Sequence, residues 1–81
     1  MTTRAAVHAA ILDILPALGR DGIDESKHLK ALGADSVDRV EIIMQSLDRC
    51  GVSAPLSRFS DLPDVGALIA LISTLQKDIA S

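Results

Sequence analysis

Apolar residues at helical spacing are the feature of this 81-residue chain that most limits its fold. They recur every three or four positions in three segments, and no segment alternates as a half-buried β-strand does. The periodic positions are Val7, Ile11, Ile14 and Leu15, then Val37, Val40, Ile43, Met44 and Leu47, and finally Val65, Leu68, Ile69, Ile72, Leu75 and Ile79. Because each segment can bury one face, the spacing predicts an all-α protein built as a small helix bundle.

Local signals predict where the first two helices begin and end. The first should run from Thr3 to Leu15, because Pro16 disfavours helical geometry in the residue before it. The second should cover residues 36–50, with Asp35 as its N-cap and a closing glycine at position 51.

Two connecting segments complete the predicted architecture. Residues 20–34 mix charges with two glycines and form a long loop, which three apolar residues should anchor: Ile23, Leu29 and Leu32. Residues 57–62 are long enough for one helical turn held by Phe59 and Leu62, and Asp64 can cap the last helix. We therefore expect one domain over residues 1–81, a four-helix bundle with three main helices and one short helix.

The second helix is predicted to carry the apolar stripe named above, with Glu41 and Asp48 bordering its Val37 and Met44 side. Ile42 falls outside this stripe, so the helix should touch neighbours on more than one side. The positions expected in the core are Leu32, Val40, Ile43, Leu68 and Ile72.

The composition argues against several classes of protein. Phe59 is the only aromatic residue and the net charge is −3, which disfavours binding to nucleic acid. Cys50 is the only cysteine, and with two histidines it offers neither a disulfide nor a metal-ligand cluster. No segment approaches the roughly 18 apolar residues of a membrane span. We expect a monomeric cytoplasmic protein with no metal site and no membrane contact.

The most informative stretch is residues 32–44, Leu-Gly-Ala-Asp-Ser-Val-Asp-Arg-Val-Glu-Ile-Ile-Met. On its own, the Asp35-Ser36 pair could simply begin a helix. The whole stretch, however, resembles the phosphopantetheine attachment site of acyl carrier proteins, in which Asp-Ser-aliphatic opens the second helix. Phe59, Asp61-Leu62 and Asp64-Val65 also follow in the order of that family, so the resemblance spans most of the chain.

The resemblance implies that Ser36 bears a covalent phosphopantetheine arm, taken from coenzyme A by a phosphopantetheinyl transferase. The arm would hold acyl groups as thioesters, and the chain would be a carrier with no catalytic residue of its own. Its further partners would be a ketosynthase, an acyltransferase or a hydroxymethylglutaryl-type synthase of polyketide or fatty acid biosynthesis. Docking in the family uses the second helix, which implies a partner surface made of Asp35, Val37, Asp38, Arg39, Glu41, Met44 and Asp48.

Arg39 and Arg49 interrupt a helix that is usually more uniformly acidic in carriers of fatty acid synthesis. The Ser-Val-Asp-Arg-Val-Glu-Ile-Ile run is more similar to freestanding carriers of polyketide pathways, in particular the donor carriers of β-branching. A solvated helix face is the alternative interpretation of these charges. Two other functions stay open at this point: a peptidyl carrier of nonribosomal synthesis, and a small helical interaction domain without a prosthetic group.

Overall fold

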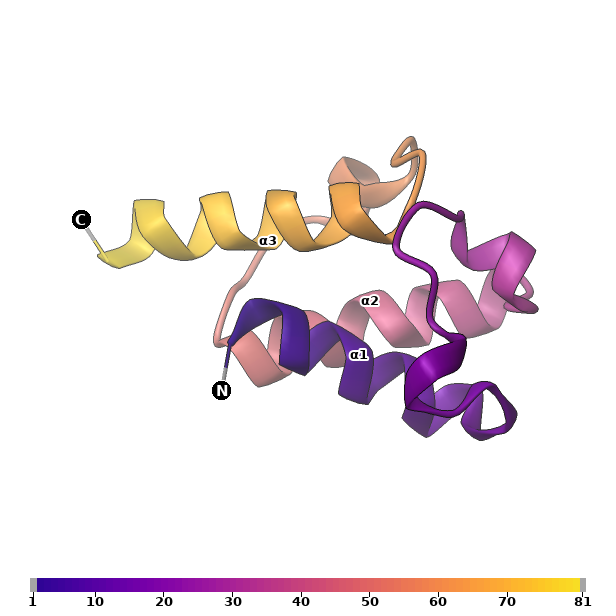
Figure 1. Ribbon diagram of the computed structural model, residues 1–81. Coiled ribbons are helices and arrows are strands. Elements are labelled where there is room, and N and C mark those ends of the chain that lie inside the picture. Colours follow the sequence, from indigo (N-terminus) through magenta and orange to yellow (C-terminus); the bar gives the residue numbers. More distant parts are fainter. Residues whose placement is uncertain (1, 81) are drawn as a thin grey trace.

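A computed structural model describes residues 2–80, without the side chains of Arg20 and residues 78–80. Its three α-helices are α1 (Thr3–Ile14), α2 (Ser36–Cys50) and α3 (Val65–Ala80), and no strand occurs among the described residues. In Figure 1, α1 and α2 run in opposite directions, and the connection after α2 returns along the molecule so that α3 runs parallel to α2. The start of α2 therefore lies at the opposite end of the bundle from the two chain termini.

Short 3₁₀ helices occupy the connections in the described part of the chain. They are η1 (Pro16–Leu18), η2 (Arg20–Gly22), η3 (Leu29–Leu32) and η4 (Leu56–Phe59). The short helix predicted over residues 57–62 is η4, which begins one residue earlier and ends before Leu62. Four residues are too few to propagate an α-helix, so the segment forms the tighter 3₁₀ turn instead. The predicted all-α bundle with three main helices is confirmed, and the described residues add three short 3₁₀ helices besides η4.

The long loop between α1 and α2 is held by its apolar anchors, as predicted. Ile23 and Leu29 are buried, and Leu32 packs half-buried against the same core. The backbone of this loop also bonds to the start of α3, because the Lys27 carbonyl accepts a hydrogen bond from the Val65 amide at 3.0 Å. The loop is thus a packed part of the fold.

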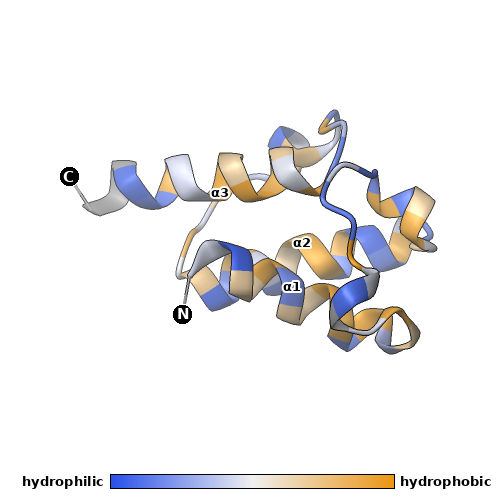
Figure 2. Ribbon diagram, in the orientation of Figure 1, coloured by the Kyte–Doolittle hydropathy of each residue, from blue (hydrophilic) through white to orange (hydrophobic). Residues whose placement is uncertain are grey.

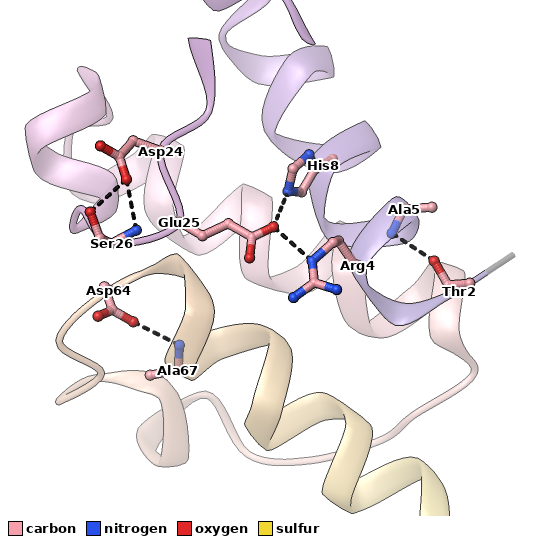
Figure 3. Close-up of polar contacts among 9 residues, drawn as sticks. All are labelled: Thr2, Arg4, Ala5, His8, Asp24, Glu25, Ser26, Asp64 and Ala67. Atoms are coloured by element: carbon pink, nitrogen blue, oxygen red, sulfur yellow. Dashed lines mark hydrogen bonds and ion pairs between the residues drawn. The ribbon is translucent and has the colours of Figure 1, made fainter. Parts of the chain in front are cut away.

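Glu25 is the main polar tie of this loop (Figure 3). Its carboxylate accepts a hydrogen bond from Arg4 Nε at 2.8 Å and lies 2.7 Å from His8 Nε2, both on α1. Its backbone carbonyl accepts a hydrogen bond from the Gly66 amide of α3 at 2.8 Å. The Arg4 hydrogen bond is the largest cause that holds the pKa of the Glu25 carboxyl below its usual value. One residue therefore joins α1, the loop and α3.

The core gathers residues from all three α-helices and from the connections, and each long helix carries both hydrophobic and hydrophilic residues (Figure 2). The buried members from the helices include Val7, Ala10, Ile11, Ile42, Leu47, Val65, Leu68, Ile69 and Ile72. Leu68 and Ile72 confirm the prediction, while Leu32 and Ile43 are only half-buried at the edge of this cluster. The predicted position Ile79 lies outside the described side chains.

The predicted inward face of α2 is partly wrong. Val40 is exposed, whereas Ile42, which fell outside the predicted stripe, has no exposed surface. The helix is turned so that Ile42, Ser46 and Leu47 face inward. Ser46 can be buried because its hydroxyl donates a hydrogen bond to the Ile42 carbonyl at 2.7 Å. Because Ser46 is polar, the apolar pattern of the sequence did not indicate that this side of the helix is buried.

Candidate functional site

The three residues before the N-cap of α2 fix where this helix begins. Leu32 ends η3 and is half-buried, Gly33 adopts a left-handed conformation with φ 109°, and Ala34 is buried in the core. Glycine tolerates that conformation because it has no Cβ. The Leu-Gly-Ala sequence therefore has a local structural reason: an apolar anchor, a reversal of the chain and a second anchor next to the helix start.

Asp35 and Asp38 form a reciprocal capping box at the start of α2. The Asp38 amide donates to Asp35 Oδ1 at 2.8 Å, and the Asp35 amide donates to Asp38 Oδ2 at 3.3 Å. Ser36, the first helical residue, is exposed and its hydroxyl takes no part in the cap. The predicted N-cap is confirmed, and its hydrogen bonds do not engage the serine hydroxyl.

A groove of about 430 Å³ opens beside Ser36. Its apolar lining comes from four elements and includes Leu29, Val40, Ile43, Phe59, Leu62 and Leu68. Polar side chains also border it: His28, Ser36, Arg39, Ser57, Ser60 and Asp64. Sequence reasoning missed this groove, although it had singled out Phe59 and Leu62 as the anchors of the segment that forms one wall.

The predicted partner residues divide into two groups. Most lie exposed on α2 or at its cap: Asp35, Val37, Glu41, Met44 and Asp48. Val37 and Met44 are 65% and 54% exposed. Asp38 and Arg39 are only half-exposed, because Asp38 belongs to the capping box and Arg39 borders the groove.

Of the other residues considered from the sequence, His28 borders the groove, whereas Cys50 and His8 are not among its lining residues. Cys50 is half-buried at the far end of α2, and burial raises the pKa of its thiol. His8 is bound to Glu25, while His28 accepts a hydrogen bond from the Lys30 amide through Nδ1 at 3.0 Å and caps η3. Among the described helices, none is long and apolar enough to cross a membrane.

Comparison with known proteins agrees with this geometry. The family model described as the phosphopantetheine attachment site matches residues 5–72. The chain therefore belongs to the family of carrier proteins that bear a phosphopantetheine group. It is similar to the polyketide biosynthesis acyl-carrier-protein AcpK of Bacillus subtilis (strain 168), with 34% identity over 62 residues, which is 76% of each chain. No solved structure gives a significant match.

These findings confirm the predicted acyl carrier family and the covalent phosphopantetheine group. They also rule out the alternative of an interaction domain without a prosthetic group. The residues at the start of α2 suit such an arm, since an exposed serine hydroxyl lies next to an apolar groove and a guanidinium group. A helix N-terminus also favours the negative charge of a phosphate.

Proposed function

We propose that this chain is an acyl carrier protein of polyketide biosynthesis and that Ser36 bears its phosphopantetheine arm. The observation that carries the proposal is the exposed hydroxyl of Ser36, which the Asp35-Asp38 capping box leaves unused in the first turn of α2. The similarity to AcpK favours a polyketide carrier over a peptidyl carrier of nonribosomal synthesis.

In the attachment reaction, Ser36 Oγ forms the bond to the phosphorus of coenzyme A that bears pantetheine. The bond from that phosphorus to the nucleotide part breaks, and a base of the phosphopantetheinyl transferase takes the hydroxyl proton. The carrier itself is non-catalytic in this proposal: among the described side chains, Ser36 Oγ forms a hydrogen bond with Arg39 and with no histidine. Its exposed position lets another enzyme reach the hydroxyl.

When bound, the arm supplies a thiol that carries an acyl group as a thioester. The chain's own contribution is to bring this group to each partner enzyme at a high local concentration. The apolar groove beside Ser36 offers a site where an acyl chain could leave water between encounters.

Partner enzymes dock on the outward side of α2 in this proposal. Its exposed carboxylates suit basic patches, and Val37 and Met44 supply apolar contact area. The proposed partners are the transferase and one or more of a ketosynthase, an acyltransferase and a hydroxymethylglutaryl-type synthase, the last for a donor carrier of β-branching. We place the protein in the cytoplasm, because a free cysteine such as Cys50 is typical of reducing compartments.

The experiment is incubation with coenzyme A and a phosphopantetheinyl transferase of broad specificity, followed by intact and peptide mass spectrometry. Wild-type protein should gain one arm, on Ser36, and Ser36→Ala should gain none while keeping its thermal midpoint. Ser57→Ala is the matched control, because Ser57 is an exposed serine that borders the same groove. Modification at another residue, or no modification of the wild type, would refute the assignment of Ser36.

A further inference from the structure

Arg39 lies next to the hydroxyl of Ser36. The two residues are three positions apart on α2 and so share one side of the helix. The side chain of Arg39 runs back toward the start of the helix, where its Nη2 atom lies 3.4 Å from Ser36 Oγ in a long hydrogen bond. Arg39 is half-buried and borders the groove beside Ser36. Its charged group therefore faces the serine rather than open solvent alone.

Among the described side chains, the positive charge of Arg39 forms no ion pair. It is the only basic residue between Asp35 and Asp48, a stretch with four acids. Even so, among the described side chains no carboxylate oxygen comes within 4.0 Å of its guanidinium nitrogens. Arg4, by contrast, forms an ion pair with Glu25 at 2.8 Å. Because the guanidinium group has no ion pair and forms a hydrogen bond with the Ser36 hydroxyl, it is positioned to bind an anion attached to that oxygen.

A phosphodiester on Ser36 would add a negative charge to a helix start that already holds Asp35 and Asp38. The helix dipole favours this charge, but the two carboxylates oppose it. A guanidinium can offset that repulsion, and its planar set of donors matches phosphate oxygens. His28 also borders the groove, but its Nδ1 is engaged as the cap of η3.

We propose that Arg39 binds the phosphate of the phosphopantetheine arm and holds it against the first turn of α2. The inference rests on the proposed attachment at Ser36, and it makes Arg39 a positioning residue for the arm. It also gives this arginine a function within the carrier itself, beside its place at the edge of the partner surface.

The test compares apo and holo forms of four proteins: wild type, Arg39→Gln, Arg39→Lys and Arg49→Gln. Arg49 is the matched control because it is an exposed arginine in the last turn of the same helix. Intact mass first establishes whether each protein carries the arm. A wild type that stays unmodified contradicts the proposed attachment, whereas a modified wild type allows the role of Arg39 to be tested by itself.

Two readouts then report on the phosphate. In ³¹P NMR, we expect the phosphodiester signal of Arg39→Gln to shift away from the wild-type signal and toward that of urea-unfolded holo-protein. Arg39→Lys should lie between them, and Arg49→Gln should match the wild type. Attachment of the arm should raise the thermal midpoint of Arg39→Gln less, or lower it more, than that of wild type. The four midpoints form a double-mutant cycle that measures the coupling between residue 39 and the phosphate. Coincident ³¹P signals of wild type and Arg39→Gln would overturn the proposal, as would an equal change in midpoint.

Discussion

The two sides of α2 use apolar residues for different purposes. On the inward side, Ile42 is fully buried and Leu47 is nearly so, within the cluster that holds the three helices together. On the outward side, Val37, Val40 and Met44 leave large parts of their side chains in water. One helix of fifteen residues thus carries two apolar surfaces, one buried in the core and one largely exposed.

This difference leads us to expect that stability and partner recognition depend on different sides of α2. Exposed large hydrophobic residues are few in the described part of the chain, and they are Val37, Val40, Met44 and Leu56. Three of these four belong to the outward side of α2, beside its exposed carboxylates. Substitutions on the two sides should therefore affect different measurements, and the following predictions test that separation.

The largest effect should come from the inward side. Ile42→Ala removes buried methyl groups and should lower the free energy of unfolding by about 2–5 kcal/mol. Met44→Ala, on the outward side, should change it by less than about 0.5 kcal/mol. Urea unfolding followed by far-UV circular dichroism measures both. Equal losses in the two variants would show that the outward side also supports the fold.

A smaller loss is expected at the N-cap of α2. Asp35→Ala deletes the acceptor for the Asp38 amide and should cost about 1 kcal/mol of unfolding free energy. Asp35→Asn should retain most of that stability, because asparagine caps nearly as well while removing the charge. If the asparagine variant is as unstable as the alanine variant, the charge of Asp35 rather than its hydrogen bond stabilises the helix.

Acid should lower the stability of the fold by protonating Glu25, which lies in the loop before α2 and not on the outward side of that helix. The folded-state pKa of Glu25 is lowered, first of all by the Arg4 hydrogen bond, so the carboxylate stabilises the fold at pH values above its unfolded pKa. That contribution is lost as the pH falls through the folded pKa. Glu25→Gln should therefore be less stable than wild type at neutral pH and lose less stability on acidification. The measurement is the thermal midpoint of wild type and Glu25→Gln from pH 7 down to pH 3, with Asp48→Asn as the control.

The smallest free-energy change is expected for docking. Glu41→Lys should weaken acyl transfer from a partner synthase a few-fold and reduce its dependence on salt, with little effect on stability. Arg39→Asp should instead reduce the discrimination of the carrier, so that the rates with a cognate synthase and with an enzyme of fatty acid synthesis become more similar. Rates at two ionic strengths measure both effects. An unchanged preference in Arg39→Asp would remove the role of Arg39 in partner choice.

Much of the site could be predicted because its determinants are local. Asp35 caps α2, Gly51 ends it, and Ser36 is its first residue, as the sequence indicated. The hydrogen bond that Asp38, the third residue of α2, accepts from the Asp35 amide was not predicted. The groove beside Ser36 was missed, since residues 28–68 assemble it from segments far apart in the sequence.

The three main helices, the N-cap of α2 and the position of Ser36 at the start of that helix could be predicted, because each depends on residues a few positions apart. Which side of α2 is buried could not be predicted, because it depends on how the other elements pack against this helix. Its apolar residues cover too wide an arc to define one inward direction, and Ser46 lies at the centre of the true buried side. The packing of α1, α3 and η4 around α2 buries Ile42 and leaves Val40 exposed. The same packing leaves an apolar groove next to Ser36.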